Sequence, residues 1–442
     1  MISIIPEKEL GNIGGKALKS MEKLGCKYKR HNRFYYIIIL MINIGIFVFF
    51  WLFYQKYLSH VAFVNRDDMY LHGMIAFRLD NAFRNGWNGI HDYLVSDRYP
   101  QVIAYPGWHL LVVAFWRVVH SISGIPEESA LILSESIVNA LCLTLTFDVI
   151  FAFFSFRVKY IIPTLSLLFV GPIYATSLIG RYYLGAYTPN IWHNPTYLAV
   201  RPFGLLTVFY IIKIFENRIE RKREYVLVGV LLVLTALCKP TFYQMFLPAL
   251  IVFCVLYAIY KQSMADLMIC VRIAIACIPV GIVALIQFAM TFGNSQSSMD
   301  GGIAIGFLYV WKHFTDHIWW SIITTLLFLL LVYVVATFRK KITLSLALSM
   351  TVLVSGFLWY AFCYYKIDPF TADFSWGLAS SLSIAFVLCL RWFFVETGDW
   401  LMFDRKKPLF IVASTLMFFY LWHLGSGIWY FANIIKRGTF LL

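Results

Sequence analysis

The chain has 442 residues, of which 60% are hydrophobic and only 14% carry a charge. A soluble domain has about 25% charged residues, so this composition excludes an ordinary soluble protein and predicts an integral membrane protein. The formal net charge is +14, but Lys and Arg gather in short clusters between apolar stretches. Such clusters are typical of loops on the cytoplasmic side of a membrane, so nucleic-acid binding is not expected.

Apolar stretches recur from Phe34 onward, and each is long enough to cross a hydrocarbon core of about 30 Å as a helix. Strand-like alternation is not seen, so the sequence predicts an all-α polytopic membrane protein. With the basic clusters as cytoplasmic markers, we expect eleven spans and an external C-terminus. The expected spans are 34–54, 130–156, 160–179, 202–216, 225–241, 244–260, 270–291, 318–337, 342–364, 377–395 and 408–430.

Two regions are expected in this arrangement. Residues 1–33 form a basic cytoplasmic segment without a small-residue cleavage site, so we interpret the first span as an uncleaved anchor. Residues 34–442 form one transmembrane domain, and the loop bias fits a bacterial plasma membrane. The segment 108–119 is interrupted by Arg117 and is shorter than the roughly 20 residues of a span. We therefore expect it to lie along the interface, within one long external loop, 55–129.

The external loop opens with two adjacent carboxylates, Asp67 and Asp68. Ionised side chains next to a bilayer must be hydrated, paired or in use, so the pair is a candidate functional site. The four-residue step of the apolar residues 71, 75, 79 and 83 predicts an interfacial helix, with Asp68 and His72 at its beginning on the apolar side. An alternative is that Asp67 or Asn65 only caps this helix.

The loop after the predicted third span is rich in aromatic rings and hydrogen-bond donors, among them His193 and Asn194. Aromatic faces stack on sugars or line a membrane interface, and for His193 a structural hydrogen bond is the simpler interpretation. Arg181 and Arg201 lie at expected outer helix ends, where basic residues are scarce. A guanidinium is well shaped to hold a phosphate.

Two further external features could face the acidic pair. Lys239 ends a hydrophobic helix, where a lysine either binds an anion or extends toward headgroups. Asp373 and Trp376 precede the tenth predicted span and could form one wall of a polar cavity, or an ordinary solvated loop. Asp67 and Asp68, with Asp373 or Asp368, could also hold Mg²⁺ or Mn²⁺ through oxygen ligands, although we favour a site without metal.

The order of these features resembles the GT-C superfamily of integral membrane glycosyltransferases, which includes protein O-mannosyltransferases and the aminoarabinose transferases of lipid A. The likeness rests on a cytoplasmic N-terminus, one span, a long external loop that opens with an acidic pair, and the segment Tyr105-Pro106-Gly107-Trp108 before the second span. It covers the first 160 residues well and the rest loosely. Gly107 replaces the second proline of the family's usual pair.

The resemblance implies a sugar donor linked to a polyprenyl phosphate and an acidic catalytic residue at the position of Asp67 or Asp68. It also implies that Lys239, with Arg181 or Arg201, holds the donor phosphate. Under this hypothesis an aspartate takes the proton of an acceptor hydroxyl and His72 orients it. We expect the sugar or the acceptor, which could be a glycan, a lipid or a protein, to contact Tyr105, Trp108, His193, Asn194, Asp373 and Trp376.

Two other classes of function stay open at this point. A surface-polysaccharide polymerase or ligase would use lipid diphosphate donors, and basic residues in an external loop would then dominate the site. A transporter of lipid-linked glycans would perform no chemistry. Transporters tend to have internal repeats and helices broken near the middle of the membrane, and the sequence has no convincing repeat.

Overall fold

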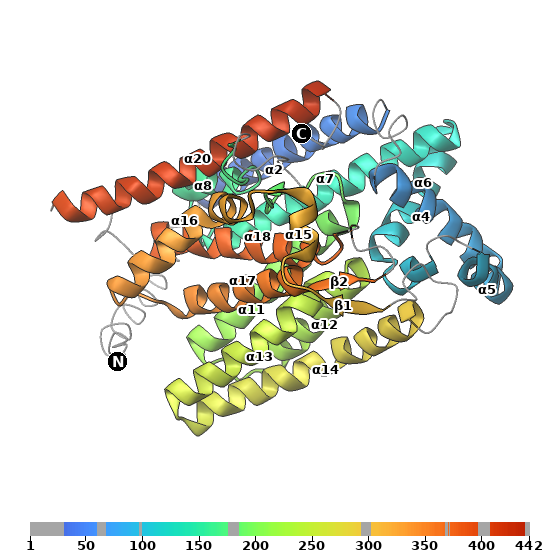
Figure 1. The fold of residues 1–442 in the computed structure, drawn as a ribbon. Helices are drawn as coiled ribbons and strands as arrows, with labels where there is room; N and C mark the ends of the chain where they lie inside the picture. Colours follow the sequence, from blue (N-terminus) through green and yellow to red (C-terminus); the bar gives the residue numbers. More distant parts are fainter. Residues whose placement is uncertain are drawn as a thin grey trace.

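The computed structural model describes residues 31–59, 68–96, 100–175, 185–292, 302–366, 370, 372–396 and 407–437. Within these ranges, nine helices are long and apolar enough to cross a bilayer, as expected for an all-α multi-pass membrane protein. They run side by side as a bundle (Figure 1). The helices that contain these nine segments are α2 (His31–Tyr57), α7 (Glu127–Phe153), α11 (Pro195–Asn217), α13 (Thr241–Lys261), α14 (Met264–Phe292), α16 (Ile318–Phe338), α17 (Leu344–Phe362), α18 (Ser375–Arg391, continued by the π-helical turn Trp392–Glu396) and α20 (Lys407–Arg437).

A tenth helix, α12 (Lys222–Cys238), corresponds to the predicted fifth span but has only 17 residues. It packs against both α11 and α14. Its last residue is followed by Lys239, whose extended backbone ends the helix, and by Pro240, which precedes α13. The chain therefore reverses direction at Lys239, and this reversal places the lysine at the end of the bundle.

The predicted loop 55–129 contains a separate layer of short helices, grouped at one end of the bundle (Figure 1). They are α4 (Asp68–Arg84), α5 (Gly86–Ser96), η2 (Pro100–Ala104) and α6 (Gly107–Ser123). The predicted amphipathic helix is present as α4, where Ile75 and Leu79 are buried together with Tyr93 and Val102. The segment 108–119 lies in α6, which packs along α7 and α4.

The prediction of one continuous helix over 160–179 is wrong for the described part of that segment. Helix α8 (Ile161–Ser166) has six residues, and the chain then turns and continues without helix to residue 175. Its backbone is satisfied by other elements: the Gly171 N–H donates to the His423 carbonyl (3.2 Å) and the Ile173 N–H to the Thr324 carbonyl (2.9 Å). Irregular backbone is tolerated at membrane depth where protein surrounds it, and an apolar sequence does not reveal this.

The α20 helix approaches this irregular segment closely. A Cβ atom at Gly427 would lie 1.7 Å from the carbonyl oxygen of Phe169, so only glycine fits. The buried Asn190 side chain donates to the carbonyls of Leu167 (3.0 Å) and Val170 (2.8 Å). The segment is thus held from two sides.

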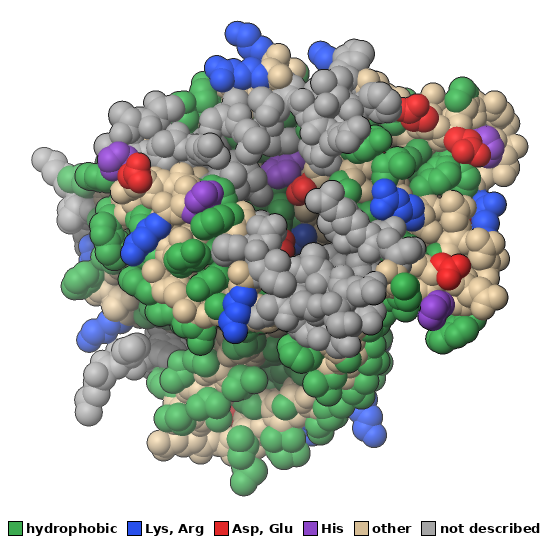
Figure 2. Space-filling view, turned by 45° about the vertical axis from the view of Figure 1, so that its right-hand side comes forward, with side chains coloured by type: hydrophobic (Ala, Val, Ile, Leu, Met, Phe, Trp, Pro, Cys, Tyr) green, Lys and Arg blue, Asp and Glu red, His purple; other side chains and the backbone are tan. Residues whose placement is uncertain are grey.

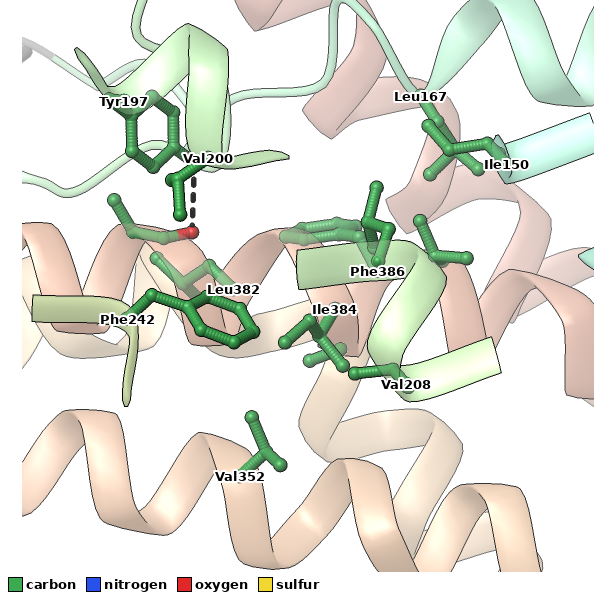
Figure 3. Packing of buried hydrophobic residues seen from close by; sticks show 14 of the residues in the cluster. Ile150, Leu167, Tyr197, Val200, Val208, Phe242, Val352, Leu382, Ile384 and Phe386 are labelled. Carbon is green, nitrogen blue, oxygen red and sulfur yellow. Dashed lines mark hydrogen bonds between the residues drawn. The ribbon is translucent and has the colours of Figure 1, made fainter. Parts of the chain in front are cut away.

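The centre of the bundle is α18, in which every residue from Ser375 to Leu390 is buried. A helix that is apolar or small all round can be enclosed completely by its neighbours. Figure 3 shows Leu382, Ile384 and Phe386 of α18 in the same apolar cluster as side chains of α11, α13 and α17. In the same view the Tyr197 hydroxyl donates to the Ala379 carbonyl, at 3.2 Å. These contacts fix the start of α18 against the start of α11.

A short two-stranded sheet completes the described fold. β1 (Ile303–Ile305) pairs antiparallel with β2 (Cys363–Tyr365), with Ile303 opposite Tyr365. β2 follows α17 directly, and α15 (Tyr309–Phe314) follows β1 after a short turn. The sheet therefore joins the segment before α16 to the segment between α17 and α18.

Candidate functional site

Four helix ends meet at one place and bring four polar or aromatic side chains together. Asp68 is the first residue of α4, Asn194 caps the start of α11, Lys239 ends α12, and Trp376 is the second residue of α18. In the space-filling view, acidic, basic and histidine side chains are visible in a recess on one face of the molecule (Figure 2). Hydrophobic side chains are also visible beside the recess (Figure 2).

Asn194 connects the acid to the lysine. Its Nδ2 donates to Asp68 Oδ2 (3.1 Å), and its Oδ1 accepts from Lys239 Nζ (3.1 Å). The same Oδ1 accepts from the Tyr197 N–H (2.9 Å), which is the capping hydrogen bond of α11. Because an amide has one donor end and one acceptor end, this orientation matches a carboxylate on one side and an ammonium on the other.

Lys239 is a buried ammonium with neutral partners. Its side chain is 8% exposed, its Nζ also donates to Thr196 Oγ1 (3.0 Å), and Nζ lies 4.3 Å from the centre of the Trp376 ring. Burial lowers the pKa of Lys239 to about 8, and the negative charges of Asp373 and Asp68 oppose this shift. In the described part of the chain, no carboxylate forms a salt bridge with Lys239. It keeps most of its positive charge at pH 7 without an ionic partner.

A second acid, Asp373, lies close to the residues of the β2 strand. It helps to line a small pocket with Tyr365 and Phe374. Burial raises the pKa of Tyr105 and of Tyr365, and the nearby charge of Asp373 adds to both shifts. Asp373, which we predicted as a sugar or acceptor contact together with Tyr105, therefore lies near enough to Tyr105 and to Lys239 for its charge to act on both.

His193 is buried beside the same cluster. Its ring centre is 6.2 Å from that of Trp376, in an edge-to-face arrangement. Burial lowers the pKa of His193 to about 4; Asp68 opposes this shift and Lys239 adds to it. The ring is therefore neutral at pH 7 and can serve as a hydrogen-bonding group without carrying charge.

His72 does not orient Asp68 as we expected. In the described structure it has no hydrogen bond to Asp68; its Nδ1 lies 2.9 Å from Nε2 of His109, in the first turn of α6. Burial is the largest cause of the lowered pKa of both rings, and the positive charge of Lys239 lowers both pKa values further. The pKa of His109 is lowered to about 3. The two histidines form a neutral pair beside the acid and lysine.

Two other predicted site residues have different surroundings from those expected. Trp108 is completely buried and its Nε1 donates to Asn139 Oδ1 of α7 (3.0 Å), so its ring is not open to a sugar. Arg201 is 4% exposed within α11, with its guanidinium 5.8 Å from the centre of the Tyr197 ring. Asp67 and Arg181 lie outside the described residues.

Sequence reasoning missed His109 and Thr196. Thr196 follows the capping Asn194 by two residues, and a helix N-terminus read from the Asn-Pro pair would have indicated it. His109 stands in an apolar stretch two residues after Gly107, and a polar residue in such a helix is itself a signal. The start of α6 lies close to the end of α12, because a Cβ at Gly107 would lie 2.9 Å from the Leu237 carbonyl oxygen.

The acids do not gather as metal ligands in the described structure. Within the described ranges, no group of three or more His, Cys, Asp or Glu side chains is arranged to hold a metal ion. Asp67 and Asp368, two of the acids considered for Mg²⁺ or Mn²⁺, lie outside those ranges. The described site is instead an acid, an amide and an ammonium in a row.

No protein-family model and no curated protein matches this chain.

Proposed function

We propose that this protein is a membrane glycosyltransferase of the GT-C type, which moves a sugar from a polyprenyl phosphate to an acceptor hydroxyl. The single observation that carries the proposal is the row Asp68, Asn194 and Lys239, in which a carboxylate and a buried ammonium are held one amide apart. A buried charge without an ionic partner is costly. An anionic substrate that contacts Lys239 would offset this cost.

The arrangement suits transfer from a lipid phosphate. Asp68 takes the proton of the acceptor hydroxyl, whose oxygen bonds to the anomeric carbon as the bond between that carbon and the phosphate oxygen breaks. The leaving polyprenyl phosphate keeps the bonding electrons, and the Lys239 ammonium stabilises its negative charge. Trp376 offers an aromatic face beside the lysine, and the apolar helices give the isoprenoid chain a lipid-like environment.

The proposal also covers the acceptor and the orientation of the chain in the membrane. The acceptor is a glycan, a lipid or a protein with a free hydroxyl. The positive-inside pattern of the basic loops favours a cytoplasmic N-terminus in a bacterial plasma membrane, with the site on the opposite face. Because α2 lies between the N-terminal segment and the α4 layer in the chain, the proposal puts these two parts on opposite faces of the membrane.

The proposal is tested with the full chain in proteoliposomes and a panel of radiolabelled polyprenyl-phosphate sugars. Asp68→Asn removes the base but keeps the shape, and we expect transfer to fall about 10²- to 10⁴-fold. Asp67→Asn is measured alongside, because the neighbouring acid is the alternative base. The matched control is Asp92→Asn, which changes an acid of α5 whose side chain is 81% exposed.

Full transfer by stably folded Asp68→Asn, Asp67→Asn and double variants would show that neither acid is catalytic. Counterflow of a lipid-linked glycan in vesicles, without any transfer product, would instead identify a transporter. A change in glycan chain length with both acids dispensable would point to a polymerase or ligase.

A further inference from the structure

The contact between His72 and His109 is a part-buried polar contact that the proposed reaction leaves unused. His109 is completely buried, whereas His72 is partly exposed. The 2.9 Å contact between His72 Nδ1 and His109 Nε2 needs one proton between two nitrogens. Either ring could donate it, and the surroundings of the second nitrogen of His109 decide which one does.

The surroundings of His109 favour a bare lone pair at Nδ1. This atom is buried and has no hydrogen-bond partner in the described structure. An N–H group there would be an orphaned buried donor, which is rare in proteins. His109 also lies in the first turn of α6, where unpaired backbone N–H groups and the helix dipole create positive potential. The proton of His109 therefore belongs on Nε2, from which it is donated to His72.

His72 must then carry its own proton on Nε2. Its Nδ1 is occupied as an acceptor, and both rings are neutral because burial opposes their protonation. His72 lies one helical turn after Asp68 on α4, so the two side chains share a face of that helix. Lys239 is near enough for its positive charge to act on both histidines. The free N–H of His72 is thus a neutral donor in the region where Lys239 favours an anion.

We infer that His109 is a positioning residue that holds His72 in the Nε2–H tautomer, and that His72 donates this hydrogen bond to a phosphate oxygen of the lipid donor. The inference rests on the proposed function for its substrate class. The tautomer itself follows from the contact and from the burial of His109. A neutral donor suits this place, since a second positive charge beside Lys239 would be disfavoured.

The tautomer is tested by solid-state NMR of the full chain, labelled with ¹⁵N-histidine and reconstituted in liposomes at pH 7.5. His72→Asn identifies the His72 signals among the ten histidines of the chain. We expect Nε2 of His72 to be protonated and Nδ1 to be a hydrogen-bonded acceptor. His109→Leu should give a mixture of tautomers, and His109→Gln should restore the single form, because its amide N–H can replace the Nε2–H group. A His72 proton on Nδ1, or a charged His72 ring, would overturn the inference.

The ligand is tested in the same samples with farnesyl phosphate, and with farnesol as the probe without phosphate. We expect farnesyl phosphate alone to shift the Nε2 signal of His72. No shift with either compound, or the same shift with both, would overturn the assignment to phosphate. In transfer assays, His72→Asn and His109→Leu should raise the KM for the lipid donor about tenfold, the size expected for one hydrogen bond to a charged group. His109→Gln and the exposed control His91→Gln should change it little.

The two proposals can fail separately. If Asp68→Asn retained full transfer but farnesyl phosphate still shifted the His72 signal, the phosphate contact would stand and the catalytic base would be wrong. If Asp68→Asn abolished transfer while the His72 signal stayed unchanged, the transferase would stand without this contact.

Discussion

Two buried charged side chains in this bundle differ in their partners: one has an ionic partner and the other has neutral ones. Asp266 of α14 is completely buried, accepts from the Tyr257 hydroxyl (2.8 Å) and forms a salt bridge with Arg218 (3.2 Å). Lys239 is buried to a similar degree, but its contacts are the neutral oxygens of Asn194 and Thr196 and the face of an aromatic ring. A charge paired within the protein is typical of a structural contact. A charge held in place without such a pair is available to a ligand.

Lys239→Met tests most directly whether the charge of Lys239 serves activity or stability. Transfer should fall about 10²- to 10³-fold, because the leaving phosphate loses its cation. Stability should stay the same or rise, since burial of a charge without an ionic partner costs free energy, and Asn194 Oδ1 still accepts from Thr196 and Tyr197. Transfer assays and denaturant unfolding measure the two quantities. A large loss of stability would show that Lys239 is a structural residue like Asp266.

Asp266→Ala should show the reverse. It removes the carboxylate that the Tyr257 hydroxyl and the Arg218 guanidinium contact, and we expect the free energy of unfolding to fall by about 2–3 kcal/mol. The value lies at the low end for a buried pair because the Arg218 side chain is 50% exposed. Denaturant unfolding in detergent measures the loss. Transfer per folded molecule should not change, and a selective loss of activity would contradict the structural assignment.

Asn194→Asp gives Lys239 an ionic partner, as Arg218 is for Asp266, and so tests whether activity needs the unpaired charge. The new carboxylate neutralises the lysine and faces Asp68, so one of the two acids takes up a proton. We expect transfer to fall about tenfold, while the cap of α11 is kept, because Asp is also a good N-cap. Asn217→Asp, at the exposed end of the same helix, is the matched control. Unchanged transfer in Asn194→Asp would mean that the free charge of Lys239 is not used.

The pH dependence is the smallest effect. Transfer should decline as pH rises through about 8, because Lys239 loses its proton there. The folded pKa lies below the ordinary value of 10.5, so between these values the unfolded chain binds more protons and the lysine's contribution to stability rises with pH. Activity and stability should therefore move in opposite directions. A pH–rate profile checks this, with Lys239→Arg expected to lose the decline; a flat profile from pH 7 to 9.5 would contradict it.

The sequence predicted the class of fold and part of the site, for identifiable reasons. Asp68, Asn194 and Lys239 all stand next to helix ends, and polar residues at such positions are visible in an apolar sequence. Trp108 was assigned to sugar binding because a sequence does not tell an exposed aromatic ring from a buried one. His109 was missed because its importance depends on contact with a residue 37 positions earlier.

The error over 160–179 has a similar origin. Hydropathy reports whether a segment prefers lipid or protein to water, but not whether its backbone is helical. The carbonyls and N–H groups of residues 167–173 are paired with residues as distant as Thr324 and His423. Such pairing follows from tertiary structure alone. The helix predicted from residues 71, 75, 79 and 83, in contrast, depends on local periodicity, and it is present as α4.

The contact between the irregular segment and α20 also bears on how the chain is made. The ribosome synthesises Phe169 and Gly171 about 250 residues before the carbonyl of His423 and the bare Cα of Gly427 that complete their surroundings. Until α20 is in place, the amide of Gly171 lacks the acceptor that it has in the folded protein. Synthesis must therefore tolerate an unfinished interior for about 250 residues, and a chain truncated before residue 423 would leave the Gly171 amide without this acceptor.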